Sequence, residues 1–271
     1  KRITMSTAQV TILIPNYKTP ELTRICLRLI RKYTDMSRVR VIAIDNHSAD
    51  DSLDYLRGLD WITLLERPPA DDDTPPLSHS RALDLALSQV DTPYVLSIHT
   101  DTFMHHPGWL DFLLSHIEGK PDVAGVGSWK LESKPLYKRV LKRIEHAIQS
   151  VYYPLLGKQV MGKGKNYYYL RSHCALYRMA ALRKVDTDFS DENDTAGKVM
   201  HRKLEEAGYK MVFLPSETLS RYIYHANHAT MVLNPQLGSS DSSIRKGRKR
   251  VEAMLNKVGA KKILADESLD R

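Results

Sequence analysis

The stretch VTILIPNYKTPELTRICLRLI, residues 10–30, contains one strand followed by one helix. The run VTILI is apolar and rich in β-branched residues, which is typical of a buried strand, and it stops at Pro15. After it, apolar residues recur at helical spacing, Thr19 can cap the helix, and Pro20 suits the first turn. The stretch therefore predicts the opening half of a βαβ unit.

The same unit repeats through the first half of the chain. Further strands and helices are expected at VRVIAIDN (39–46), ADDSLDYLRGL (49–59), WITLLER (61–67), a helix over about 77–90, and PYVLSIH (93–99). Strands that alternate with helices favour a parallel sheet, because a parallel connection needs a crossover segment. We therefore expect an α/β protein with a Rossmann-like, mostly parallel central sheet flanked by helices.

The second half of the chain continues with mixed elements. We expect helices over 106–117, 135–151 and about 194–207, strands at DVAGVGSW (122–129), HCALYR (173–178) and KMVFLP (210–215), and a basic, weakly amphipathic tail from 238.

The composition is that of a globular protein with an anionic partner. Hydrophobic residues make up 42% of the 271 residues and charged residues 27%, and the net charge is +8. The charge favours a nucleotide, a nucleic acid or an acidic membrane surface. No apolar run has the length of a membrane span or a signal core, so we expect a cytoplasmic protein in which Cys26 and Cys174 are reduced core residues.

The segment LSIHTDTFMHHPGW (96–109) begins as a buried strand and ends in polar side chains. Asp101, flanked by Thr100 and His99, would lie at the carboxyl end of the sheet, where open α/β sheets bind ligands. A carboxylate there can hold a divalent cation while phosphate oxygens complete the coordination shell. The alternative is that Asp101 caps the following turn and His99 is a solvated loop residue.

Four segments together resemble a known family. In order and separation, VTILIPNYKTPELTRICLRLI, VIAIDNHSADDS, YVLSIHTDTFMHHPGWLDFLL and AGYKMVFLP are similar to the inverting family 2 glycosyltransferases of the GT-A fold, especially their rhamnosyltransferase-like members. The likeness covers roughly residues 9–228. It implies a metal-dependent enzyme that moves a sugar from a nucleotide diphosphate to an acceptor hydroxyl.

The resemblance also implies a donor site. Its nucleotide-binding positions correspond to Pro15, Asn16, Tyr17, Asp45, Ser48, Arg81 and Thr100. A carboxylate at position 45 could accept a hydrogen bond from a pyrimidine N–H, and Arg81 could clamp a phosphate. Alternatively, Asp45 and Ser48 form a helix cap before ADDS, and Arg81 is only the solvent side of its helix. The family usually has Asn where this chain has Lys18.

The cation ligands implied by the resemblance are Asp101, His225 and His99. The family's Asp-x-Asp motif here reads His-Thr-Asp, so the usual ligand Asp101 is kept and His99 replaces the first Asp. The cofactor would be Mn²⁺ or Mg²⁺, and we favour Mn²⁺ because imidazole suits it better.

The catalytic base implied by the resemblance lies near the start of the helix before EEAGYKMVFLP. Asp194 is the best placed carboxylate, with Glu192 and Asp191 as competitors. Asp194 could equally be the N-cap of that helix.

From these assignments we expect three regions: a nucleotide-sugar-binding half over 1–133, an acceptor-binding and catalytic-base half over 134–237, and a basic tail over 238–271. The donor would be of the UDP or dTDP type and the acceptor a glycan or lipid-linked molecule. The basic segments 138–143 and RKGRKR (245–250) favour peripheral contact with an anionic membrane at its inner face.

Two rival functions use some of the same features. A nucleotidyltransferase acting on a sugar phosphate also places carboxylates at strand ends, but it usually has a glycine-rich loop after the first strand, and PNYKTPE has no glycine. A basic nucleic-acid-binding protein would show a zinc, RRM or KH signature, which we do not find. We therefore expect no nucleic-acid partner.

Overall fold

The computed structural model describes residues 8–131, 167–227, 229–234 and 241–271, together with 145, 148, 149 and 152. Most of the helix expected over 135–151, including its basic segment 138–143, and the tract from 153 to 166 lie outside the described residues. No helix within the described ranges is long and apolar enough to span a bilayer.

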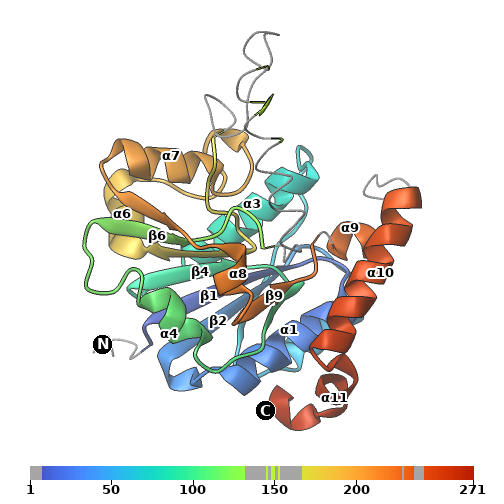
Figure 1. The fold of residues 1–271 in the computed structure, drawn as a ribbon. Coiled ribbons are helices and arrows are strands. Elements are labelled where there is room, and N and C mark those ends of the chain that lie inside the picture. Colours follow the sequence, from blue (N-terminus) through green and yellow to red (C-terminus); the bar gives the residue numbers. More distant parts are fainter. Residues whose placement is uncertain are drawn as a thin grey trace.

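A seven-stranded sheet forms the centre of the fold (Figure 1). Its order is β3-β2-β1-β4-β7-β6-β8, with β7 antiparallel to both of its neighbours and the other pairs parallel. The strands are β1 (Val10–Asn16), β2 (Val39–Asp45), β3 (Thr63–Glu66), β4 (Tyr94–Ile98), β6 (Val123–Gly127), β7 (Cys174–Arg178) and β8 (Lys210–Phe213). The expected mostly parallel α/β sheet is confirmed. The single sheet takes strands from both expected halves of the chain, whose division at 133 stays a prediction.

Helices cover both faces of this sheet, as Figure 1 shows. They are α1 (Pro20–Tyr33), α2 (Asp51–Arg57), α3 (Pro75–Leu87), α4 (Trp109–Leu114), α6 (Met179–Val185), α7 (Lys198–Glu206), α8 (Ser216–Leu219), α9 (Ala229–Leu233), α10 (Asp241–Lys257) and α11 (Ala260–Ala265), with 3₁₀ turns η1 (Met36–Arg38), η3 (Asp191–Asn193) and η5 (Glu267–Asp270).

Alternation along β1 explains the two hydrophobic cores. Ile12 and Ile14 pack with α1, α4 and α11, whereas Leu13 packs with α3, α6 and α7. Successive side chains of a strand point to opposite faces, so a central strand with helices on both sides must be apolar throughout. Cys26 of α1 and Cys174 of β7 are buried and unpaired, and burial raises the pKa of each thiol, as expected for core residues.

A short antiparallel pair of strands lies beside the main sheet. β5 (Thr102–Met104) pairs with β9 (Ile223–His225), and Thr102 stands opposite His225. The Ala226 N–H also donates to the Asp101 carbonyl oxygen at 2.9 Å. The pair therefore brings His225 next to Asp101 across 124 positions of sequence. We did not expect β5, because a three-residue strand shows too little alternation to be recognised.

The C-terminal segment is fixed to α1 by a buried ion pair. The Arg28 guanidinium donates to both carboxylate oxygens of Asp270 at 2.8 and 2.5 Å and to the carbonyl oxygens of Ile263 and Leu264. The Tyr55 hydroxyl donates to the same carboxylate at 2.7 Å. Because Arg28 is 3% exposed, its charge depends on Asp270 for compensation.

We expect Asp270→Ala to lower the free energy of unfolding by about 3 kcal/mol, because it leaves the buried Arg28 charge without its partner. The control is Glu66→Ala. It breaks a similar two-bonded pair with Arg57, but both side chains there are about half exposed, so the loss of stability should be much smaller than for Asp270→Ala. Urea unfolding of both variants measures the difference, and equal losses would contradict the buried-pair account.

Candidate functional site

The carboxyl ends of three adjacent strands meet at one edge of the sheet. β2 ends at Asp45, β1 ends at Asn16, and the segment 99–101 follows β4 on the other side of β1. Asn16 and Asp45 are register partners. This edge is where an open α/β sheet binds ligands.

A buried hydrogen-bond network fills the space between the ends of β1 and β2. The Asn16 amide donates to Asp45 Oδ1 at 2.8 Å and to the hydroxyls of Ser48 at 3.0 Å and Ser52 at 2.8 Å. The Ser48 N–H donates to Asp45 Oδ2 at 3.0 Å. The helix cap considered for Asp45 and Ser48 is wrong, because the N-cap of α2 is Asp50, whose side chain accepts from the Ser52 N–H. Asp45 is buried, and both of its carboxylate oxygens already accept hydrogen bonds.

Hydroxyl groups extend this network towards Asp101. Thr23 donates to Asn16 Oδ1 at 2.7 Å, Thr19 lies 3.2 Å from Thr23, and the Thr100 hydroxyl lies 3.1 Å from that of Thr19. The structure thus brings together Asn16, Asp45, Ser48 and Thr100 of the predicted nucleotide site. These four side chains are buried, whereas Pro15 and Tyr17 beside them are half-buried.

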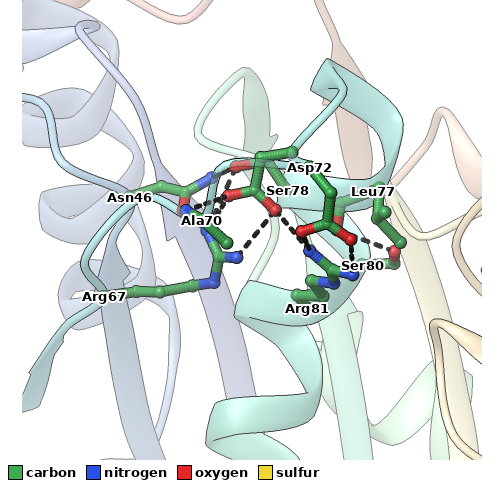
Figure 2. A network of polar contacts seen from close by, with 9 residues as sticks. Asn46, Arg67, Ala70, Asp72, Leu77, Ser78, Ser80 and Arg81 are labelled. Carbon is green, nitrogen blue, oxygen red and sulfur yellow. Dashed lines mark hydrogen bonds and ion pairs between the residues drawn. The ribbon is translucent and has the colours of Figure 1, made fainter.

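Arg81 lies in a separate ionic network, shown in Figure 2. Its guanidinium donates twice to Asp72, at 2.6 Å each, and once to Asp73 at 3.0 Å. Asp73 also accepts from Arg67 at 2.7 and 2.9 Å, and these hydrogen bonds hold its pKa at about 2. Arg67 reaches Asn46 at 3.0 Å, so the network adjoins the end of β2. A phosphate could bind Arg81 only by competing with these carboxylates. The sequence showed the acidic loop but not its pairing with the two arginines.

Three side chains converge beside the end of β4. The ligand atoms of His99, Asp101 and His225 all lie within 4.8 Å of one another. His225 Nε2 is 3.1 Å and His99 Nδ1 is 3.8 Å from Asp101 Oδ1. Two atoms that each lie about 2.1 Å from one divalent ion stand about 3.0 Å apart at a right angle and about 4.2 Å apart on opposite sides. Both distances fall in that range.

The polar atoms of this cluster fit a cation. Asp101 Oδ1 and His225 Nε2 are buried, and among the described residues each has only the other, 3.1 Å away, within hydrogen-bond distance. Asp101 Oδ2 accepts from the Ala229 N–H at 3.1 Å, and His225 Nδ1 lies 3.0 Å from Asn227 Oδ1, which turns Nε2 towards Asp101. Burial acts to raise the pKa of Asp101, but His225, His99 and the Ala229 N–H outweigh it and hold the pKa below its ordinary value. An ionised, coordinatively unsaturated carboxylate between two imidazoles suits a divalent transition ion.

Two further histidines, which no local pattern marks, lie beside the cluster. The rings of His79 and His99 meet edge-on at 4.8 Å, and His173 stacks on His225 at 4.5 Å. Burial lowers the pKa of His79 to about 4 and that of His173 well below its ordinary value. His173 immediately precedes β7, and the antiparallel placement of β7 beside β4 brings it here. That placement could not be read from spacing.

The three candidate bases lie on the turn before α7, and each carboxylate pairs with a cation. Asp191 pairs with Lys203 at 2.9 Å, Glu192 with Arg202 at 2.5 Å, and Asp194 with Lys198 at 2.7 Å. Asp191 also accepts hydrogen bonds from the Thr187 hydroxyl and the Asp188 N–H. In the described part of the chain, no hydrogen bond or ion pair joins these three carboxylates to the His99, Asp101 and His225 cluster.

The expected helix start at Asp194 is wrong. Helix α7 begins at Lys198 with Gly197 as its N-cap, in the left-handed region at φ 75°. Asp194 instead follows η3 in an extended conformation and accepts from the Thr195 N–H at 2.6 Å. The positive φ of Gly197 is the physical reason, because that conformation separates the turn from the helix. Asp194 is therefore not needed as a helix cap.

Asp84 of α3 anchors the segment that leads to this turn. Its carboxylate accepts from the backbone N–H groups of Phe189 at 2.7 Å and Ser190 at 3.0 Å. Burial nevertheless raises the pKa of Asp84 to about 6. No local pattern predicts this contact, because it joins positions more than a hundred residues apart.

The raised pKa of Asp84 predicts a pH-dependent stability. The folded protein binds a proton more tightly than the unfolded chain, so this contribution is complete below about pH 4 and is lost as pH rises through 6. Asp84→Asn does not titrate. The wild type should therefore lose stability relative to this variant as the pH rises. The difference in free energy of unfolding, variant minus wild type, should increase by about 2 to 3 kcal/mol between pH 4 and pH 7.5. Urea unfolding at both values tests this, and a constant difference would contradict it.

Known proteins with a similar sequence or fold are glycosyltransferases. The family described as Glycosyl transferase family 2 matches residues 11–186. A mannosyltransferase from Pyrobaculum calidifontis, solved with GDP-Man and Mn²⁺, aligns with 76% of this chain and 55% of its own at 17% identity and a TM-score of 0.55. This chain thus spans little more than half the length of that enzyme.

A second solved protein, TarS 1-349 of S. aureus, gives a similar result. Its complex with UDP aligns with 92% of this chain and 71% of its own at 15% identity, with a TM-score of 0.53. Its complex with UDP-GlcNAc aligns over 92% and 72% at 14% identity, with a TM-score of 0.50. At these identities the likeness shows the fold. No curated protein sequence matches the chain.

Proposed function

Because the chain belongs to glycosyl transferase family 2, we propose that it moves a sugar, with inversion, from a nucleotide diphosphate to a hydroxyl of a glycan or lipid-linked acceptor. The fold is GT-A, and the activity class is that of a glycosyltransferase. The observation that carries the finer proposal is the convergence of His99, Asp101 and His225 at the carboxyl end of β4.

The cation site of this proposal uses those three side chains. When bound, a divalent cation supplies neutralisation of the charge that grows on the departing nucleotide diphosphate. Asp101 contributes an ionised oxygen, and the two histidines contribute nitrogen ligands, a donor set that favours Mn²⁺ over Mg²⁺. Mn²⁺ is also the ion in the solved complex of the Pyrobaculum mannosyltransferase.

The donor in this proposal lies across the strand-end crevice. Pro15, Asn16, Tyr17, Asp45 and Ser48 would hold the base and ribose, and Thr100 would lie beside the diphosphate. The buried network holds these loops in one arrangement, so donor binding requires little ordering of the protein. We propose a UDP or dTDP donor, and Arg81 would act only after release from Asp72.

The chemical step in this proposal is a single displacement. The acceptor oxygen attacks the anomeric carbon on the face opposite the diphosphate, the carbon–oxygen bond to the diphosphate breaks, and Asp194 takes the hydroxyl proton. Asp191 holds its own turn, and the Glu192 side chain is 60% exposed beside Arg202. We therefore favour Asp194, whose side chain is 37% exposed.

The acceptor in this proposal approaches from the side of α10. A cavity of about 430 Å³ lies between β9 and α10, with His225 at one end and Arg250 and Lys257 on its wall. These cations suit an acceptor that carries phosphate. Together with the other basic residues of α10, Arg250 and Lys257 also support a cytoplasmic enzyme that contacts the inner face of an anionic membrane. Co-sedimentation with vesicles that does not depend on anionic lipid would remove the membrane contact.

Thermal unfolding with added ligands tests the function. A ligand at about 100 times its Kd adds about 2.7 kcal/mol, which raises Tm by several degrees for a chain of this size. We expect UDP or dTDP to stabilise the protein with Mn²⁺ and much less with EDTA. Stabilisation only by GDP would overturn the proposed UDP or dTDP donor. Stabilisation only by a polynucleotide would contradict the proposed function.

A further inference from the structure

The Ser172 hydroxyl lies between two imidazole rings at the edge of the cation cluster. Its Oγ is 3.0 Å from His99 Nε2 and 3.1 Å from His79 Nε2. The three residues come from separate parts of the fold: His99 follows β4, His79 is on α3, and Ser172 precedes β7. Ser172 is 8% exposed, so bulk water competes little for these contacts.

One hydroxyl can donate only one hydrogen bond, but its oxygen has two lone pairs. At most one of the two imidazoles can therefore accept the Ser172 proton, and at least one must donate an N–H to Oγ. His99 carries its proton on Nε2 if it donates to Ser172 and on Nδ1 if it accepts from Ser172.

The position of His99 relative to Asp101 decides the direction. His99 Nδ1 lies 3.8 Å from Asp101 Oδ1, which is too long for a hydrogen bond and suits two ligands of one ion. A ligand nitrogen must present its lone pair, so the proton of His99 belongs on Nε2. His99 then donates to Ser172, which leaves the hydroxyl proton available for His79 Nε2.

We propose that Ser172 and His79 are positioning residues that hold His99 as its Nε2–H tautomer, with the Nδ1 lone pair directed at the cation site shared with Asp101 and His225. This rests on the cation site of the proposed function. Partners of this kind fix the orientation of metal-binding histidines, and their loss typically costs 10- to 100-fold in metal affinity.

A second serine–histidine pair nearby provides a matched control. The Ser128 hydroxyl lies 3.0 Å from His173 Nε2, and the His173 ring stacks on His225. The chemistry is the same, but Ser128 is not bonded to any of the three candidate ligands. Ser128→Ala removes a buried hydroxyl that contacts none of the three candidate ligand rings.

The experiment measures Mn²⁺ binding by the EPR signal of the free ion, using the full chain without nucleotide. We expect Ser172→Ala to raise the Kd for Mn²⁺ by at least about tenfold and Ser128→Ala to change it by less than about twofold. Wild-type affinity in Ser172→Ala, or an equal loss in Ser128→Ala, would overturn the inference.

Nitrogen-15 NMR of the histidine rings provides a readout without metal and without any variant. We expect the metal-free wild type to carry the His99 proton on Nε2, and Ser172→Ala to show a mixture of tautomers. A proton on Nδ1 of the wild type would overturn the inference even if the variant failed to fold.

Asp101→Asn separates this inference from the proposed function. If Asp101→Asn binds Mn²⁺ as tightly as wild type, the cation site itself is wrong, and the inference is overturned with it. If Asp101→Asn loses binding while Ser172→Ala keeps it, only the role of Ser172 is overturned.

Discussion

Asp101→Asn is expected to lower kcat/KM for Mn²⁺-dependent sugar transfer by at least about 10³-fold, equivalent to about 4 kcal/mol of transition-state stabilisation. The amide is nearly the same size as the carboxylate and can still accept the Ala229 N–H. The amide lacks the negative charge of the Asp101 carboxylate, which is buried between His99 and His225. The fold should therefore survive while the cation is lost.

Asp91→Asn is the control for this prediction. Asp91 precedes the opposite end of β4 and forms an exposed pair with Arg40, far along the strand from the cluster. The same chemical change there should leave turnover within about twofold. Initial rates with UDP- and dTDP-sugars test both variants, and turnover in Asp101→Asn within threefold of wild type would contradict the assignment.

Asp194→Asn is expected to lower kcat by about 10²- to 10⁴-fold while nucleotide affinity stays unchanged. Burial acts to raise the pKa of Asp194, but the Lys198 ammonium and the Thr195 N–H outweigh it and hold the pKa below its ordinary value. The carboxylate is thus ionised and able to accept a proton throughout the neutral range. The amide variant cannot accept that proton.

The two neighbouring carboxylates distinguish a catalytic loss from a disturbed turn. Glu192→Gln should keep kcat near that of wild type, because its exposed pair with Arg202 contributes little. Asp191→Asn should lower stability, because its carboxylate holds Thr187, Asp188 and Lys203. A large fall in kcat confined to either of these two variants would move the base away from Asp194.

The alternation of strands and helices was predictable because it depends on local periodicity. Strands β1, β2 and β4 and helix α1 lie where the apolar patterns predict them. The position of β7 was not predictable, because its antiparallel insertion between β4 and β6 is chosen by packing. The start of α7 was misplaced because Asp194 and Thr195 carry a strong capping signal, whereas the structure uses Gly197.

The candidate site was predictable to a smaller extent. The position of Asp101 at a strand end followed from the pattern, but His225 came only from the family resemblance. The contact between them depends on the β5–β9 pair. His79, Ser172 and His173 were missed because no local pattern marks a side chain that becomes important only through a neighbouring strand. The pairing of Arg81 with Asp72 was missed for a similar reason, because propensity does not predict which opposite charges meet.

A crystal structure of the full chain with Mn²⁺ and UDP, with the anomalous signal of manganese recorded, tests the proposed cation site directly. We expect one anomalous peak within about 2.5 Å of Asp101 Oδ1, His99 Nδ1 and His225 Nε2, in contact with the diphosphate. A manganese peak on the diphosphate that lies away from all three side chains would contradict it.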